Sequence, residues 1–294
     1  MKRWKKTSAL VILMLMLASC ILGGCGEKGP LTARPPKSLK VLAVGGSFSI
    51  DTMEYLYDIA TAAGVKEVVL GNLYNGGCSL QRHVLFYKSQ QTGYSYYKNT
   101  DGQWNVTDNY TLSEALADEE WDYISLQQTS ALSGLPESYE TALPELISIV
   151  REKCPETPLM WHMTWAYQQD YESDAFKDYN SDQMTMYNGI VNCLNECVDK
   201  QEVFEFVIPV GTAIQNARTS FLGDTLTRDG LHLDEQIGRY IGGLTWYAAI
   251  TNSSIEKIDY NPAPEMITDE MMEAAKEAVT NAILNPREVT ESTY

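Results

Sequence analysis

Short apolar segments alternate with amphipathic ones along most of the chain. The short apolar segments end in glycines or polar residues, as buried strands do. We predict strands at 40–44, 65–70, 123–127, 158–164 and 204–208. Apolar residues at helical spacing predict helices at 48–63, 80–88, 139–153, 182–198, 235–250 and 268–284. Strands that alternate with helices indicate a parallel sheet covered on both faces.

One segment departs from this alternation. Between Gly93 and Thr111, aromatic residues recur on either side of the pair Asp101-Gly102. An Asp-Gly pair between two such stretches is typical of a β-hairpin. We therefore predict a flavodoxin-like three-layer α/β/α sandwich with five parallel strands. The hairpin is expected to be a small insertion outside that sheet.

The N-terminus has the features of a bacterial export signal. Basic residues at positions 2, 3, 5 and 6 precede an apolar run at 9–18, which is shorter than the roughly 20 residues that span a bilayer. Cys20 and Cys25 both follow stretches that resemble a bacterial lipobox. We favour Cys25 as the lipidated residue, because apolar residues still follow Cys20 whereas a polar stretch follows Cys25. An ordinary secreted protein with an incidental cysteine is the alternative.

These features predict the domain organisation and the location. Residues 1–24 are the expected lipoprotein signal peptide, 25–39 a flexible tether, and 40–294 a single domain large enough for a full core. We expect the protein to be exported and attached by its lipid to the outer face of a bacterial cell membrane.

Charge and cysteine content exclude several partners. The net charge is −17, and it becomes −21 once four basic residues leave with the signal. Such a surface disfavours nucleic acids and other polyanions. We interpret Cys78, Cys154, Cys193 and Cys197 as small buried side chains, since four cysteines do not form a disulfide framework in a domain of this size. We expect a monomer without metal or cofactor.

With three histidines, the candidates for a general base are few. His162 stands in an apolar strand and is expected in the core, and His83 has no carboxylate near it in sequence. His232 differs, because Asp229 precedes it by three residues in a turn before a helix. A carboxylate in that position orients the imidazole and stabilises the imidazolium that forms when the base takes a proton.

Ser47 is the candidate nucleophile. It follows the first predicted strand and the turn Gly45-Gly46, at the carboxyl edge of the sheet where ligands bind in such folds. A helix N-terminus there supplies amide donors for an oxyanion. The alternative is that Ser47 or Ser49 only caps the helix.

Four sequence blocks together resemble the SGNH/GDSL hydrolases. The similarity is greatest to a branch of which many members carry only a domain-of-unknown-function label, with the blocks G-N-S-F-S, G-G-C-S-L-x-R-H, L-Q-Q and D-G-x-H-L. The corresponding blocks here begin at Gly45, Gly76, Leu126 and Asp229, and the resemblance covers nearly all of residues 40–250.

The resemblance implies the SGNH hydrolase fold and a serine esterase. Ser47 would be the nucleophile, His232 the base and Asp229 its orienting partner. The oxyanion hole would combine the backbone N–H of Ser47 with one from Gly76 or Gly77 and a side-chain amide. Two positions depart from the pattern: Gly46 replaces the usual aspartate, and no asparagine stands in the third block. Gln127 or Gln128 must then supply the amide, which is worth roughly 3 kcal/mol; we favour Gln128.

The resemblance also implies acyl esters as substrates, often acetyl groups on carbohydrates. Candidate substrate contacts are Arg82, His83, Thr164 and Trp165. A binding lipoprotein that kept the fold and lost the chemistry is the competing hypothesis, although it would not need Ser47, Asp229 and His232. A metal-dependent hydrolase is disfavoured because the histidines lack metal-binding spacing.

Overall fold

A computed structural model describes residues 31–294, and one mixed β-sheet forms its centre. The strands are β1 (Ser38–Gly45), β2 (Glu67–Tyr74), β3 (Tyr94–Asn99), β4 (Trp104–Tyr110), β5 (Tyr123–Leu126), β6 (Leu159–His162) and β7 (Phe204–Ile208). Their order in the sheet is β4-β3-β2-β1-β5-β6-β7. The five strands from β2 to β7 in this order are parallel, which confirms the predicted flavodoxin-like arrangement.

The hairpin exists, but its predicted position outside the sheet is wrong. Strand β3 pairs antiparallel with β2, from Leu70 opposite Asn99 to Tyr74 opposite Ser95, and β4 then pairs with β3. Without this pairing, β2 would leave a row of backbone N–H and C=O groups open at the edge of the sheet. The hairpin satisfies these groups, and the largely exposed β4 becomes the sheet edge instead.

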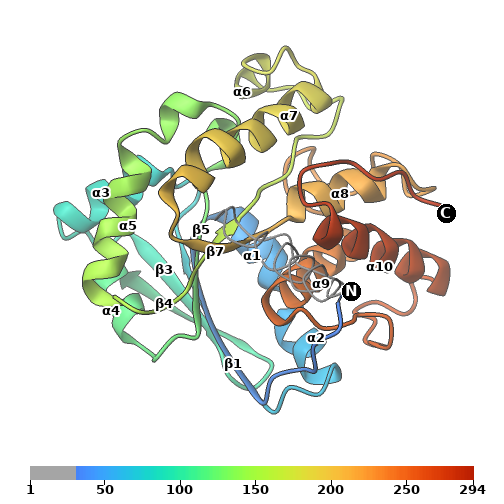
Figure 1. The fold of residues 1–294 in the computed structure, drawn as a ribbon, viewed down its shortest axis with the longest axis horizontal. Coiled ribbons are helices and arrows are strands. Elements are labelled where there is room, and N and C mark those ends of the chain that lie inside the picture. The colour runs from blue at the N-terminus through green and yellow to red at the C-terminus, as the bar shows by residue number, and fades with distance from the viewer. Residues whose placement is uncertain (1–30) are drawn as a thin grey trace, which may run out of the picture.

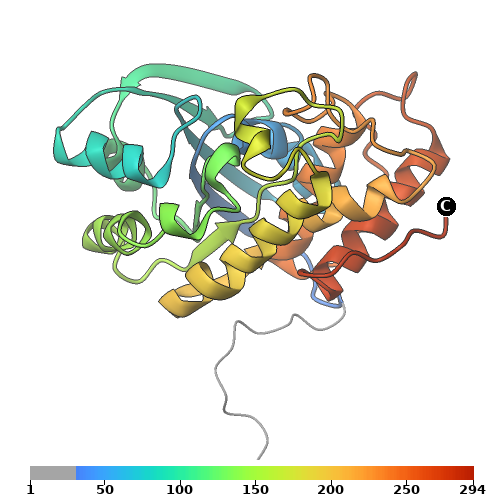
Figure 2. The ribbon, with the colours of Figure 1, turned by 90° about the horizontal axis from the view of Figure 1, so that it is seen from above.

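Helices cover both faces of the sheet (Figures 1 and 2). They are α1 (Ser47–Met53), α2 (Leu56–Ala62), α3 (Leu80–Lys88), α4 (Leu112–Ala117), α5 (Ala142–Lys153), α6 (Asp174–Lys177), α7 (Gln183–Cys193), α8 (Val210–Arg218), α9 (Ile237–Thr251) and α10 (Asp269–Leu284). Side chains of β1 alternate between two cores. Val41 packs in the core with α1, α2, α8, α9 and α10, and Leu42 packs in the core with α3, α4, α5 and α7.

Two predicted helices differ in detail from the observed ones. The helix predicted at 48–63 is broken near Tyr55, so that α1 and α2 are separate. The helix predicted at 182–198 ends as α7 and continues as a π-helical turn, Leu194–Val198. The helices α4, α6 and α8 were not predicted, because the first two are very short and α8 begins directly after Pro209 without a polar cap.

The boundary of the domain lies slightly before the predicted one. Strand β1 begins at Ser38, and Ala33, within the predicted tether, donates its backbone N–H to the carbonyl of Asn252 at 3.0 Å. The signal peptide, Cys20 and Cys25 lie outside the described residues. In residues 31–294, no helix combines the length and the apolar character that crossing a membrane requires.

Candidate active site

Ser47 is the first residue of α1, directly beyond the carboxyl end of β1. The N-cap is Gly46, so neither serine caps this helix through its side chain. The Ser49 hydroxyl is buried and donates to the Gly46 carbonyl at 2.8 Å, while Asn72 Oδ1 lies 2.9 Å from it. The Ser47 side chain is only half-buried and lines a pocket. A capping role therefore does not explain this serine.

Asp229 and His232 form a compact acid–imidazole pair in the loop before α9. Asp229 Oδ2 lies 2.6 Å from His232 Nδ1, and Asp229 Oδ1 accepts the backbone N–H groups of Leu231 and His232. Gly230, with φ of +81°, allows the tight turn that this requires. Burial alone would raise the pKa of Asp229, but the hydrogen bonds from His232 and Leu231 outweigh it and hold that pKa below its usual value.

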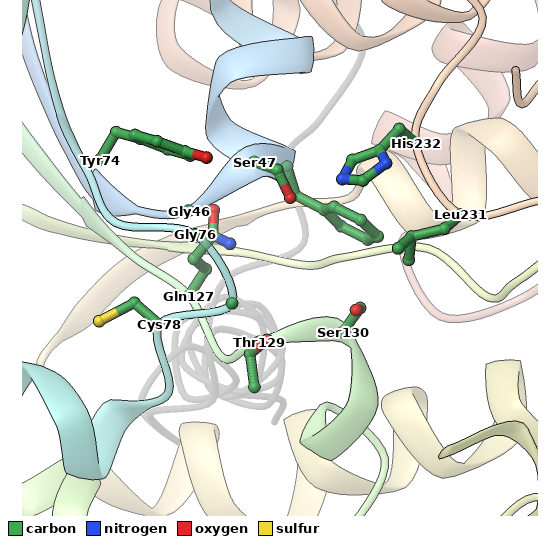
Figure 3. A pocket seen from close by; sticks show the side chains of 12 residues that line it. Gly46, Ser47, Tyr74, Gly76, Cys78, Gln127, Thr129, Ser130, Leu231 and His232 are labelled. Atoms are coloured by element: carbon green, nitrogen blue, oxygen red, sulfur yellow. The ribbon is translucent and has the colours of Figure 1, made fainter. Parts of the chain in front are cut away.

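A pocket of about 310 Å³ joins these two parts of the chain. Its wall consists of Gly46, Ser47, Phe48, Tyr74, Gly76, Gly77, Cys78, Gln127, Thr129, Ser130, Leu231 and His232. Figure 3 shows the Ser47 hydroxyl and the His232 ring turned toward one another across this pocket. Since Nδ1 is held by Asp229, the other ring nitrogen, Nε2, is the one available to the serine. The structure thus brings together all three predicted triad residues.

The predicted backbone donors lie in the same pocket. Gly76 and Gly77 follow β2 and present main-chain atoms to the pocket because they have no side chains. Gly77 has φ of +60°, a conformation that favours glycine. A Cβ on Gly46 would lie 3.2 Å from the Asn75 carbonyl oxygen, so the turn after β1 fits closely against the turn after β2. A side chain at position 46 would therefore have little room.

The two glutamines have different roles, and the preference for Gln128 is wrong. Gln128 Oε1 accepts the backbone N–H groups of Leu80 and Thr129, and its amide donates to the Ser138 carbonyl at 3.2 Å. Both ends of this side chain are therefore engaged in holding loops together. Gln127 lines the pocket, and its Oε1 lies 3.0 Å from His162 Nδ1. Gln127 is the glutamine that can face an oxyanion.

None of the four predicted substrate contacts lines this pocket. His83, Thr164 and Trp165 are each at most 2% exposed, so they cannot contact a substrate there. His83 Nδ1 lies 2.8 Å from the Tyr94 hydroxyl within the core. Arg82 lies on the outer side of α3, where its guanidinium packs over the ring of Phe86. These residue types resembled substrate contacts, but the fold turns their side chains elsewhere.

Trp165 instead packs against two parts of the site. Its ring stacks on Phe48, the neighbour of Ser47, with centroids 3.7 Å apart and planes 3° from parallel. Its indole N–H donates to the Leu231 carbonyl at 2.8 Å. One buried side chain thus contacts both α1 and the loop that carries Asp229 and His232 (the histidine loop).

A buried ion cluster also connects α1 with the histidine loop. Asp51 is fully buried, and its Oδ1 lies 3.0 Å from both Arg228 Nη1 and Arg239 Nε. Its Oδ2 accepts the backbone N–H of Leu233 at 3.0 Å. Sequence reasoning missed this cluster, although an aspartate among the apolar residues of a predicted helix was a signal for it.

Cys78 is another nucleophilic side chain in the pocket wall. Burial raises the pKa of its thiol to about 12, and the nearby charge of Arg82 offsets this only in part. The thiolate is the reactive form of cysteine. Cys78 is therefore an inert part of the wall.

Comparison with known proteins identifies the family. The sequence profile of a domain of unknown function, DUF4886, matches residues 40–282. The crystal structure of a DUF4886 family protein from Bacteroides uniformis has 46% identity and a TM-score of 0.82, covering 86% of this chain and 98% of its own.

More distant similarities are to a candidate SGNH hydrolase from Slackia heliotrinireducens and a lipase/acylhydrolase from Enterococcus faecalis. The first has 16% identity and a TM-score of 0.49, over 71% of this chain and 97% of its own. The second has 15% identity and a TM-score of 0.46, over 72% and 95%. No curated protein sequence matches this chain. The profile match and the identity to the Bacteroides uniformis protein show that the chain belongs to the DUF4886 family.

Proposed function

We propose that this protein is a serine esterase of the SGNH/GDSL type. One observation carries the proposal: Ser47, far from His232 in sequence, shares a pocket with the nitrogen of His232 that Asp229 leaves free. A serine, a base and an orienting carboxylate in this order are the parts of a nucleophilic hydrolase. Burial keeps the Cys78 thiol protonated, and Ser47 is the hydroxyl of the pocket that is turned toward the His232 ring.

The proposed reaction begins with attack of Ser47 Oγ on the ester carbonyl carbon. His232 Nε2 takes the hydroxyl proton, and the carbonyl oxygen becomes an oxyanion. The backbone N–H of Ser47, one from Gly76 or Gly77 and the Gln127 amide are the proposed donors to it. The intermediate then expels the alcohol, which receives the proton from His232. An acyl-serine remains.

Water completes the cycle by the same route. His232 takes a proton from water, the resulting nucleophile attacks the acyl carbon, and Ser47 Oγ leaves with the proton from His232. Asp229 stays ionised throughout, because its hydrogen bonds hold its pKa low. It stabilises the imidazolium at each step without handling the proton itself.

The proposed substrate is a short acyl ester, most simply an acetyl group on a carbohydrate. The pocket volume of about 310 Å³ is at the lower end of the range for ligand sites, which suits a small acyl group. The polar rim residues Thr129 and Ser130 and the half-buried Tyr74 would contact the alcohol part.

The test is hydrolysis of aryl acetates, run beside covalent labelling with a serine-directed phosphonate. We expect turnover of the acetate, faster than of long-chain aryl esters, and a single phosphonate adduct on the peptide that contains Ser47. A protein that binds acetylated sugars but shows neither turnover nor an adduct would be the binding lipoprotein instead.

We further propose that Cys25 carries the lipid that attaches the protein to the membrane. Metabolic labelling with a fatty-acid analogue should mark the wild-type protein and the variant Cys20→Ala, but not Cys25→Ala. Label that persists in Cys25→Ala and disappears in Cys20→Ala would move the anchor to Cys20. Label unaffected by either change would end the proposal.

A further inference from the structure

Gln127 and His162 lie side by side at the ends of two neighbouring strands. Leu126 and Trp161 are partners in the parallel register of β5 and β6. Gln127 directly follows the end of β5, and His162 is the last residue of β6. Gln127 forms part of the pocket wall, whereas His162 is fully buried. Their side chains meet with His162 Nδ1 3.0 Å from Gln127 Oε1.

The chemistry of this contact determines where the proton lies. An amide oxygen only accepts hydrogen bonds, so Nδ1 must carry the hydrogen, and burial lowers the pKa of His162 to about 3, which keeps the ring neutral. His162 Nε2 is then a bare lone pair, buried without a partner.

The opposite arrangement would turn the Gln127 amide around and move the proton to His162 Nε2. That ring makes a T-shaped contact with Trp246, whose indole N–H is itself buried and unpartnered. With the proton on His162 Nε2, this ring pair would bury two N–H donors without acceptors. With the proton on Nδ1, only the Trp246 N–H is a donor without an acceptor. The arrangement with Nδ1 protonated is therefore the better one.

We propose that His162 is a positioning residue, which holds the Gln127 amide with its N–H groups toward the oxyanion site. The proposal rests on the esterase function above. Because Oε1 is engaged by the buried ring, the two N–H groups of the amide are left to the pocket. In this way a glutamine supplies the donor although its extra methylene gives it more freedom than asparagine has.

The same amide also lies against the backbone at the end of β1. A Cβ on Gly45 would lie only 2.8 Å from Gln127 Oε1, so the absence of a side chain at Gly45 lets the amide lie against the end of β1. Two residues later the chain reaches Ser47. Gln127 is thus confined between the strand that carries the nucleophile and the ring of His162.

A kinetic series tests the proposal. Gln127→Ala should lower kcat for an aryl acetate by about 100-fold, because one oxyanion donor is lost. His162→Leu removes the buried donor and should lower kcat by about tenfold or more with little change in KM. His162→Asn, which retains an N–H at the position of Nδ1, should recover most of that loss. The double variant Gln127→Ala/His162→Leu should match Gln127→Ala alone, because His162 acts through Gln127.

A spectroscopic measurement on the wild-type protein provides a readout that does not depend on activity. Long-range ¹H–¹⁵N correlation of the three imidazoles, assigned by substitution, should show His162 neutral and protonated at Nδ1 between about pH 5 and 8. The Nε2–H tautomer would overturn the proposal even in an inactive protein. In an active one, losses that multiply in the double variant, or unchanged kcat in His162→Leu, would overturn it. Failure of the wild type to hydrolyse any ester contradicts the esterase function itself.

Discussion

Replacing Ser47 by alanine should lower kcat/KM for aryl acetate hydrolysis by about 10⁴-fold or more and abolish phosphonate labelling. In the proposed reaction the hydroxyl forms the acyl-enzyme bond, and the Cys78 thiol, whose pKa is raised by burial, cannot replace it. Because the Ser47 side chain is half-buried and supports no helix cap, the variant should keep the unfolding midpoint of the wild type. Initial rates and circular dichroism on the same preparation check both expectations.

His232→Ala should cost nearly as much as Ser47→Ala, and the double variant should be no worse than either single one. Groups that act as one unit lose their combined effect at the first deletion. Asp229→Ala should be milder, since it orients the ring and takes no proton. Cys78→Ala is the matched control at the pocket wall and should retain most of the activity. An active Ser47→Ala variant, or single losses that multiply, would exclude the triad.

The sequence was sufficient to predict the parallel sheet, and together with the family resemblance it singled out Ser47, Asp229 and His232, which the structure groups around one site. Buried parallel strands leave short apolar runs, and their carboxyl ends meet at one edge, which places Ser47 near the loops after β2 and β5. The pairing of Asp229 with His232 is local, since a turn of three residues brings the two side chains within 2.6 Å. The meeting of Ser47 with His232 is a long-range contact, and the order and spacing of the sequence blocks pointed to it.

Choices between adjacent residues could not be made from the sequence. Consecutive residues beyond a strand point to opposite sides, so Gln127 and Gln128 differ only in which side faces the pocket. That side is set by tertiary packing, here by His162 on one side and the loop at Ser138 on the other. The same limit applies to Trp165. From the sequence, an aromatic residue after a strand can either stack on a bound sugar or pack in the core, and in the structure Trp165 is buried in the core.

The hairpin position also depended on tertiary structure. The sequence predicts that residues 93–111 fold back on themselves, and they do. Whether such a hairpin joins the sheet depends on how far β2 extends beyond its apolar run. The run at 65–70 gave no indication that the strand continues to Tyr74, where pairing with β3 takes place.

Asp51→Ala should destabilise the fold by about 3–5 kcal/mol, because it leaves two partly buried guanidinium groups without their partner. Asp51 is fully buried, and the side chains of Arg228 and Arg239 are 32% and 17% exposed. The Leu233 N–H would lose its acceptor as well. Denaturant unfolding followed by circular dichroism measures the free energy. Asp174→Ala, which removes a fully exposed partner of Lys177, is the matched control and should leave the midpoint nearly unchanged.

Asp51→Asn separates the contribution of the carboxylate charge from that of its shape. The amide oxygen can still accept the Leu233 N–H, but the charge that holds the two arginines is gone. Because Arg228 directly precedes Asp229, we expect the histidine loop to loosen, and kcat to fall by about tenfold or more, at temperatures where the protein remains folded. An Asp51→Asn variant that is less stable yet fully active below its unfolding midpoint would show that the cluster supports the fold without placing His232. Pre-steady-state acylation rates, measured below the unfolding midpoint of the variant, decide between these outcomes.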